Sequence, residues 1–377
     1  MKVALLTSGG IAPCLSASIG RLVENYIKKY PNIEIIGYLN GYKGLLQGKK
    51  ISFPKSIIKN ISSFYTFGGS PLGNSRVKLT NTKDCISKGY VKKNQNPLKI
   101  AADQLVKDKI SILHTIGGDD TNTTAADLSA YLKEHNYNLT VVGLPKTVDN
   151  DLPVTDNCPG FGSVAKYIAV STMEASFDVA SMAATSTKIF VLEVMGRHAG
   201  WIAAAGGLVD SSIPVVILFP EVDFNEEKFL AKVDQNVKEY GYCTIVVSEG
   251  TKWPDGTFLA EQGTRDDFGH AQLGGAAPVV ANIIKKALGY KFHWAVADYL
   301  QRAARHLASN SDVEQAYALG KAAVEMALDG KNSIMPSIVR KSNNPYQWEI
   351  GYGELKDIAN VEKMMPESYI SEDGFSI

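Results

Sequence analysis

Short, almost wholly apolar segments alternate along the chain with longer segments whose apolar residues recur at helical spacing. The apolar segments are expected to be strands, at 3–6, 33–38, 110–116, 140–144, 189–194, 215–219 and 244–247. Helices are expected between them, at 15–27, 100–107, 123–133, 164–182 and 226–239. Strands of nearly continuous Val, Ile and Leu separated by helices indicate parallel sheets that are covered on both faces. The pattern therefore predicts an α/β protein.

Glycine-rich or charged segments directly follow five of these strands. In parallel sheets, ligands bind beyond the carboxyl ends of the strands, so these segments are the expected sites of chemistry. They are TSGG at 7–10, GGDD at 117–120, PKTVDND at 145–151, MGR at 195–197 and SEG at 248–250.

Composition narrows the classes of partner. The 377 residues suggest two domains or one large α/β unit. Lys+Arg and Asp+Glu both number 39, so the chain has no strongly basic field for nucleic acid or an anionic membrane.

Its four cysteines form no CxxC pair and are expected to be reduced thiols. The apolar N-terminal run is too short for a signal or a membrane span, so we predict a soluble, cytoplasmic protein.

Two glycine turns are candidate anion or cation sites. The turn at 7–10 lets backbone N–H groups approach an anion near a helix N-terminus, although an ordinary tight turn is an equal alternative. In the second turn, Asp119 and Asp120 follow two glycines and favour a hard cation such as Mg²⁺, which binds one or two carboxylates plus substrate phosphates. The alternative is a surface turn in which Asp120 caps a helix.

The segments at 145–151 and 195–197 carry the groups that phosphoryl transfer needs. Lys146 is suited to hold phosphate charge, and a nearby carboxylate such as Asp149 is suited to take a proton from an attacking hydroxyl. Arg197 follows a strand and a glycine and is suited to a fork-like grip on phosphate oxygens. His198 is assigned no role.

These segments resemble the motifs of the phosphofructokinase family, in the same order along the chain. The resemblance includes Glu249 and a late Gln301-Arg302 pair, and it extends from residue 1 to about 330. The resemblance implies two Rossmann-like, three-layer α/β/α domains with mostly parallel sheets and an active site in the cleft between them. A donor domain is expected at 1–164 plus about 301–340, and a sugar-phosphate domain at about 165–300 plus 341–377. The region near 252–275 is interpreted as an inserted loop. Its stretch 268–275 has Leu273 where a phosphate-binding arginine would be needed.

Two positions indicate the phosphoryl donor. Asp120 and Lys146 stand where the ATP-using branch of that family has glycine, and this is the pattern of its pyrophosphate-using branch. A carboxylate at 120 would charge the space that a nucleotide's α-phosphate crosses, and such repulsion amounts to several kcal/mol at an effective dielectric constant of about 20. Lys146 would supply a cation for a small diphosphate. The family's usual Asp, Gly and Asn are also missing from 8–16, which again fits pyrophosphate.

The implied reaction is reversible, Mg²⁺-dependent transfer of a phosphoryl group from pyrophosphate to the C1 hydroxyl of fructose 6-phosphate. Its products are fructose 1,6-bisphosphate and phosphate, and it would serve glycolysis or gluconeogenesis. The alternatives are an ATP-dependent phosphofructokinase and a catalytically silent regulatory subunit that binds sugar phosphate.

The resemblance also implies roles for single residues. Asp149 would be the general base, with Lys146, Asp120 and Arg197 completing the catalytic set. Pyrophosphate would contact Gly10, Arg76 and Lys146, and Asp119 would hold Mg²⁺. The residues expected to bind the sugar phosphate are Thr147, Asp149, Asp151, Lys188, Met195, Gly196, Arg197, Glu249, His293, Tyr299 and Arg302.

Two of these residues indicate an oligomer. Lys188 and His293 align with arginines that the family supplies from a neighbouring subunit, so a homodimer or homotetramer is expected. Lysine still holds phosphate as a point charge, whereas histidine would be a weaker, pH-sensitive ligand. Lys291 could take the place of His293.

Overall fold

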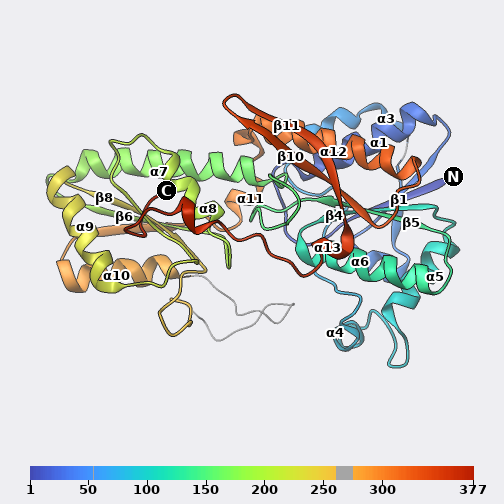
Figure 1. Cartoon of the computed structure of the whole chain (residues 1–377), viewed down its shortest axis with the longest axis horizontal. Helices are drawn as coiled ribbons and strands as arrows, with labels where there is room; N and C mark the ends of the chain where they lie inside the picture. Colours follow the sequence, from blue (N-terminus) through green and yellow to red (C-terminus); the bar gives the residue numbers. More distant parts are fainter. Residues whose placement is uncertain (54, 260–274) are drawn as a thin grey trace. The chain divides into compact units, whose positions relative to one another are not determined.

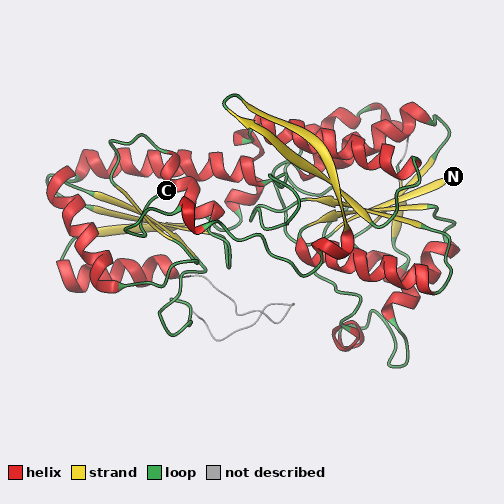
Figure 2. Cartoon of the chain, viewed as in Figure 1, coloured by secondary structure: helices red, strands yellow, loops and turns green. Residues whose placement is uncertain are grey.

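The computed structural model describes residues 1–53, 55–259 and 275–377, which form two compact units (Figure 1). Unit 1 comprises residues 1–163 and 308–362, and unit 2 comprises residues 164–307 and 363–377. Both combine a central sheet with helices, as Figure 2 shows. No helix in the described parts of the chain has the length and apolar character needed to cross a membrane.

The sheet of unit 1 has seven strands, in the order β11-β10-β5-β4-β1-β2-β3. The strands are β1 (Lys2–Thr7), β2 (Glu34–Tyr38), β3 (Lys50–Ser52), β4 (Ile112–Gly117), β5 (Thr140–Pro145), β10 (Ile334–Asn343) and β11 (Tyr346–Glu354). The neighbours β1, β4 and β5 run parallel, with Val3 opposite Ile112 and Ile112 opposite Thr140. Their carboxyl ends therefore lie at one edge of the sheet.

Helices cover both faces of this sheet because side chains alternate along its strands. Val3 and Leu5 of β1 pack on one side with α1 and α12, whereas Ala4 and Leu6 pack on the other with α5, α6 and α13. Figure 1 shows the two helical layers. The helices of unit 1 are α1 (Leu15–Lys29), α2 (Tyr42–Gln47), α3 (Lys55–Lys59), α4 (Thr82–Ser87), α5 (Pro97–Lys107), α6 (Asp119–Glu134), α12 (Asn310–Leu328) and α13 (Leu355–Ile358).

The sheet of unit 2 has four parallel strands, in the order β7-β8-β6-β9. The strands are β6 (Ile189–Val194), β7 (Val215–Leu218), β8 (Cys243–Ser248) and β9 (Phe292–Val296). The helices that accompany them are α7 (Phe161–Met182), α8 (Trp201–Ala204), α9 (Glu226–Tyr240), α10 (Ala276–Leu288) and α11 (Leu300–Ala303). Val191 and Ile245 pack in one core with Phe229 of α9 and Val280 of α10.

The prediction of an α/β fold with mostly parallel sheets is confirmed, and each predicted strand is present with small shifts at its ends. The first turns of α5, α6 and α7 were missed, so that α6 begins at Asp119 and not at 123. Strands β3, β9, β10 and β11 were also missed. β3, β9 and β11 lie at the edges of their sheets, and their partial exposure mixes polar residues with apolar ones. β10 is an inner strand, but only its first half, residues 334–338, is buried, and Pro336 and Ser337 interrupt the apolar run there.

The expected assignment of residues 341–377 to the sugar-phosphate domain holds for 363–377 and is wrong for 341–362. Residues 341–362 belong to unit 1, because β10 continues to Asn343 and pairs with β11 in antiparallel register. Leu355 and Ile358 then bury their side chains completely in the unit 1 core. Residues 301–307 fall in unit 2 and not in unit 1.

A buried carboxylate holds the start of α7. Asp312, in the first turn of α12, accepts hydrogen bonds from the N–H groups of Gly160 at 3.0 Å and Ser163 at 3.1 Å. The Ser163 hydroxyl also donates to Asp312 at 2.5 Å and accepts the N–H of Ser309 at 3.2 Å. Asp312 therefore fixes the backbone of unit 1 next to two points where the chain passes between the units.

We predict that Asp312→Ala lowers the free energy of unfolding by about 3 kcal/mol, because it leaves buried N–H groups without acceptors. Asp329→Ala, at the exposed C-terminal end of the same helix, is the control and is expected to change stability by less than about 0.5 kcal/mol. Urea unfolding measures both variants. Equal stability of the two would contradict the role assigned to Asp312.

Candidate active site

Three loops of unit 1 meet at the carboxyl edge of its sheet, after β1, β4 and β5. Backbone hydrogen bonds tie each loop to the neighbouring strand, from Ser8 N to Ile116 O at 3.0 Å and from Lys146 N to Gly117 O at 3.0 Å. The ammonium of Lys146 lies 3.4 Å from the Ser8 carbonyl oxygen and also donates to the carbonyl of Gly10. The structure thus brings together Gly10 and Lys146, two of the predicted phosphate-binding residues.

Two glycines in these turns stand where a side chain would be strained. Gly9 has a φ of +76°, a backbone conformation that residues with a side chain rarely adopt. A Cβ on Gly117 would lie 2.2 Å from the Thr121 Oγ1, which is too close for a real contact. The Lys146 side chain is 2% exposed, so its charge is largely removed from water. The site therefore holds a buried cation beside a glycine turn.

The loop that precedes Arg76 is bonded to the same glycine turn. Ser75 accepts the N–H of Gly9 at 3.1 Å and the hydroxyl of Ser8 at 2.7 Å through its carbonyl oxygen. The Asn74 side chain donates to the Gly9 carbonyl at 2.9 Å. These bonds place Arg76 next to the turn, as its predicted role requires.

Carboxylates gather around the start of α6. Burial raises the pKa of Asp119 to about 6, and the charges of Asp120 and Asp151 add to that shift. Burial also raises the pKa of Asp151, with a further contribution from Asp149. The Oδ1 atom of Asp151 is buried and has no hydrogen-bond partner among the described residues. This concentration of negative charge is the environment that a bound cation would relieve.

These residues fit Mg²⁺ in the mode it uses with phosphates. Within the described residues, no three His, Cys, Asp or Glu side chains group closely enough to enclose a metal ion. Mg²⁺ usually keeps several waters and takes one or two carboxylates plus substrate phosphate oxygens. Asp119, whose hydrogen bond from Thr123 is 3.3 Å long, could serve as such a carboxylate.

The loop that carries Asp149 is folded back on itself. The N–H of Asp149 donates to the Thr147 hydroxyl at 3.1 Å, and Thr147 forms a parallel β-bridge with Gly160. Asn150 adopts a left-handed φ of 54°, and its side-chain oxygen accepts the N–H of Cys158 at 2.9 Å. Because both ends of the loop are held, Asp149 is fixed in unit 1.

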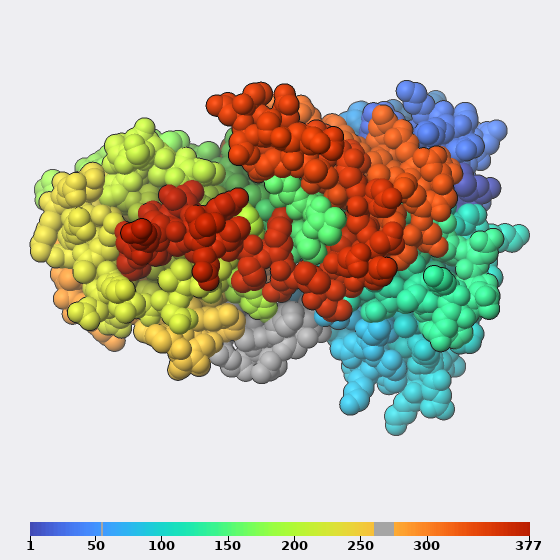
Figure 3. Space-filling view, in the orientation of Figure 1, coloured from blue at the N-terminus to red at the C-terminus, as the bar shows by residue number. Residues whose placement is uncertain are grey.

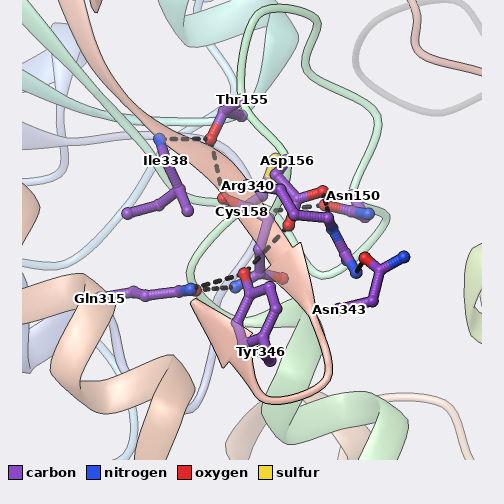
Figure 4. Close-up of polar contacts among 10 residues, drawn as sticks. Asn150, Thr155, Asp156, Cys158, Gln315, Ile338, Arg340, Asn343 and Tyr346 are labelled. Atoms are coloured by element: carbon purple, nitrogen blue, oxygen red, sulfur yellow. Dashed lines mark hydrogen bonds and ion pairs between the residues drawn. The ribbon is translucent and has the colours of Figure 1, made fainter. Parts of the chain in front are cut away.

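The β10–β11 hairpin supports the far side of this loop. The N–H of Asp156 donates to the Ile338 carbonyl at 2.8 Å, and the Ile338 N–H donates to the Thr155 hydroxyl at 3.0 Å. Arg340 and Tyr346 donate to the Asp156 carboxylate at 2.8 and 2.9 Å (Figure 4). In Figure 3, green atoms of the loop lie against the orange-red hairpin. Sequence reasoning missed these residues because it did not predict the hairpin.

In unit 2, the predicted residues after β6 and β8 are also neighbours. Gly196 has a φ of +123°, and a Cβ on Gly250 would lie 1.9 Å from the Arg197 carbonyl oxygen. Glycine is thus needed at 250 for the two turns to touch. Burial raises the pKa of Glu249, and the positive charge of Arg197 acts against that shift. The Nη1 atom of Arg197 is buried and lacks a hydrogen-bond partner among the described residues. Met195 precedes this turn.

Arg302 and Tyr299 follow β9, the other neighbour of β6, at the same edge of the unit 2 sheet. The Arg302 guanidinium carbon lies 4.1 Å from the centre of the Tyr299 ring, a cation–π contact. Tyr299 is 64% exposed, whereas Gln301 is fully buried and donates to the Asp298 carbonyl at 2.9 Å. Arg302 is therefore fixed by the turn that follows the strand.

Lys188 and His293 are not brought together with Arg197 and Glu249 within unit 2. Lys188 directly precedes β6, and its ammonium donates to the Ala183 carbonyl at 2.8 Å. His293 is exposed near the start of β9, opposite Phe190. Both lie toward the amino ends of their strands, whereas Arg197 and Glu249 follow the carboxyl ends. The stretch 268–275, which sequence analysis rejected as the phosphate clamp, lies outside the described residues except for Gly275.

Sequence reasoning also missed two charged residues at these edges. Glu193, inside β6, is buried and accepts the N–H groups of Gly275 at 3.1 Å and Ala277 at 2.9 Å, which places it at the N-terminus of α10. A charged residue in an otherwise apolar strand is the signal that could have found it. Lys78 forms an ion pair with Asp120 at 2.6 Å, a contact that no local pattern reveals.

Comparisons with known proteins agree on one family. The phosphofructokinase family matches residues 2–327. A pyrophosphate–fructose 6-phosphate 1-phosphotransferase from Methylococcus capsulatus is 51% identical over 375 residues, which is 98% of this chain and 87% of that relative. The protein of that name from Halomonas elongata is 48% identical, covering 98% and 87%. The crystal structure of a pyrophosphate-dependent phosphofructokinase from Nitrosospira multiformis is 49% identical with a TM-score of 0.89, covering 100% of this chain and 88% of that one.

We predict that Mg²⁺ with methylenediphosphonate, a diphosphate that cannot transfer a phosphoryl group, raises the melting temperature of the protein by several degrees. Asp119→Asn should remove most of that shift, because it removes the charge that would hold the cation. Asp127→Asn, on the same helix, is the matched control and should keep the shift. A full shift in Asp119→Asn would contradict the metal role of Asp119.

Proposed function

The chain belongs to the phosphofructokinase family, and we propose that it transfers a phosphoryl group reversibly between pyrophosphate and the C1 hydroxyl of fructose 6-phosphate. The products of the forward reaction are fructose 1,6-bisphosphate and phosphate. Relatives that share about half of its residues over nearly its full length carry that activity in their names. The observation that carries the proposal is the pair of charged residues, Asp120 and Lys146, at the carboxyl edge of the unit 1 sheet.

The donor side of the reaction rests on this pair. Asp120 would obstruct a nucleotide whose additional phosphate passed its carboxylate. The repulsion amounts to several kcal/mol for an unpaired carboxylate about 4 Å away at an effective dielectric constant of about 20, and the ion pair with Lys78 reduces it. Lys146 is buried beside Gly10, where a small diphosphate that brings no adenosine contacts would gain most from a cation. Arg76, next to the glycine turn, would add a second cation. Backbone N–H groups of the turn would bind the remaining phosphate oxygens.

Mg²⁺ would bridge the pyrophosphate oxygens and offset their charge during transfer. Asp119 would hold it, with the rest of its ligands supplied by water and the donor itself. Lys146, Arg76 and Arg197 would stabilise charge that develops in the transition state, which is where positioned cations accelerate phosphoryl transfer. Asp149 would take the proton from the C1 hydroxyl as that oxygen attacks phosphorus.

The acceptor would be bound by residues from both units. Thr147 and Asp151 of unit 1 flank Asp149 in the chain, and their side chains would orient the sugar hydroxyls. The unit 2 residues that would contact the sugar and its 6-phosphate are Met195, Gly196, Arg197, Glu249, Tyr299 and Arg302. Arg197 has a buried guanidinium nitrogen without a described partner, which suits it to an anionic ligand.

Lys188 and His293 would complete the sugar-phosphate site of a neighbouring copy. Lys188 and His293 lie at the amino ends of β6 and β9, whereas Arg197 and Glu249 follow the carboxyl ends of β6 and β8. This separation within unit 2 supports the assignment to a neighbouring copy. Active sites completed in this way require at least a homodimer, and a homotetramer would also satisfy them.

We predict that Asp149→Asn lowers kcat by roughly two orders of magnitude or more, the scale of losing a general base, while KM for fructose 6-phosphate changes little. Asn keeps the shape of the side chain but does not take a proton. Asp103→Asn, an exposed aspartate of α5, is the control and should keep full activity. A normal kcat in Asp149→Asn would remove Asp149 from the role of base.

The proposed activity is tested with purified protein, Mg²⁺ and fructose 6-phosphate, with either pyrophosphate or ATP as the donor. We expect fructose 1,6-bisphosphate to form with pyrophosphate and not with ATP. Turnover with ATP alone would overturn the donor assignment while leaving the family unchanged. Binding of sugar phosphate without turnover by either donor would instead indicate a regulatory subunit.

A further inference from the structure

Asp120 does not stand alone at the start of α6, because Lys78 forms an ion pair with it. The Lys78 ammonium lies 2.6 Å from the Asp120 carboxylate, and the two side chains are 30% and 27% exposed. We propose that Lys78 is a donor-specificity residue, which positions the Asp120 carboxylate and offsets its charge so that pyrophosphate is accepted beside it. This inference deepens the proposed function and rests on it.

The backbone around Lys78 is fixed on both sides. Val77 is 4% exposed and Leu79 is fully buried, and both pack in the same core as Ala125 and Leu128 of α6. Lys78 lies between these two buried anchors, and its ammonium reaches Asp120 in the first turn of α6. The Lys78 side chain is therefore held against α6 within reach of its first turn. A lysine on a mobile surface loop would lose more side-chain entropy in forming such a pair.

The charge balance at this turn explains why a cation is needed. Asp120 lies directly beside Asp119, and its negative charge contributes to the raised pKa of that neighbour. An isolated carboxylate at 120 would repel the phosphates of ATP, but it would repel pyrophosphate as well. An ion pair keeps the bulk of the carboxylate in place and reduces the repulsion that a small donor meets. The pair thus blocks the path of a longer donor without excluding the shorter one.

Lys78 also acts further along the same face of α6. Its positive charge opposes the rise in the pKa of Asp127, which follows Asp120 by two helical turns and is half-buried. Asp120 and Asp127 are therefore two acidic side chains within electrostatic range of this ammonium. The Lys78 ammonium lies within hydrogen-bond distance of the Asp120 carboxylate.

A double-mutant cycle of Lys78→Met and Asp120→Asn tests this role. Steady-state kinetics of the full-length enzyme with Mg²⁺, fructose 6-phosphate and varied pyrophosphate give kcat and KM for each variant. We expect Lys78→Met to raise KM for pyrophosphate about tenfold with kcat changed by less than about twofold, because it exposes the donor to an unbalanced carboxylate. In the Asp120→Asn background, the same substitution should change KM by no more than about twofold.

The chain offers a matched control and a conservative variant. Lys88 forms an ion pair with Asp84 at 3.2 Å, and its side chain is 27% exposed, close to the 30% of Lys78. Lys88→Met therefore removes a comparable lysine outside the proposed site and should leave KM for pyrophosphate unchanged. Lys78→Arg keeps the positive charge and should restore KM to within about threefold of the wild-type value. If Lys78→Met does not fold, Lys78→Gln replaces it in the cycle.

Two results would overturn the inference, and a third would overturn the proposed function. An unchanged KM in Lys78→Met would show that the ion pair does not affect the donor. An equal tenfold loss in the Asp120→Asn background would show that Lys78 binds phosphate directly and not through Asp120. If the wild-type protein does not turn over pyrophosphate, the proposed function itself is overturned. This failure differs from a failure of the Lys78 inference because it is seen without any variant.

Discussion

The site depends on the crowding of like charges where three parallel strands end. The register of β1, β4 and β5 places their loops at one edge of a sheet, and two of those loops carry Asp119, Asp120 and Asp151. Burial raises the pKa values of Asp119 and Asp151, and the charges of Asp120 and Asp151 add to the shift at Asp119. Such an arrangement costs stability unless cations balance it. Lys78 supplies one such cation, and a bound metal ion would supply another.

The surrounding structure holds these charges in place. Asp312 bonds the backbone at the end of the 146–160 loop, and the β10–β11 hairpin bonds its middle through Asp156. Gly9 supplies a left-handed backbone turn, and Gly117 leaves room for the Thr121 side chain at the start of α6. Each support lies outside the residues that would contact the ligands. Without these supports, the loop could move its carboxylates away from those of α6. Such a movement would lower the repulsion between them, and the arrangement that binds the ligands would be lost.

The sequence predicted the parts of this arrangement that leave a local signal. The central strands are continuous apolar runs, and the glycine and charged residues that follow them could be placed at one edge by the rules of parallel sheets. Strands β3, β9 and β11 were missed because exposure to solvent at the sheet edges interrupts their apolar pattern. The Lys78–Asp120 pair and the contact of Tyr346 with Asp156 join residues far apart in the chain. Such pairings arise from tertiary packing, so no local spacing predicts them.

We infer that these charges serve an inorganic donor and not a nucleotide. The reverse reaction is a direct test of this inference. No pyrophosphate is present at the start, so any that is detected has been formed by the protein. Purified protein is incubated with Mg²⁺, fructose 1,6-bisphosphate and phosphate, and ³¹P NMR follows the products. We expect pyrophosphate and fructose 6-phosphate to form together in equal amounts. Absence of pyrophosphate, with ATP formed when ADP replaces phosphate, would contradict it.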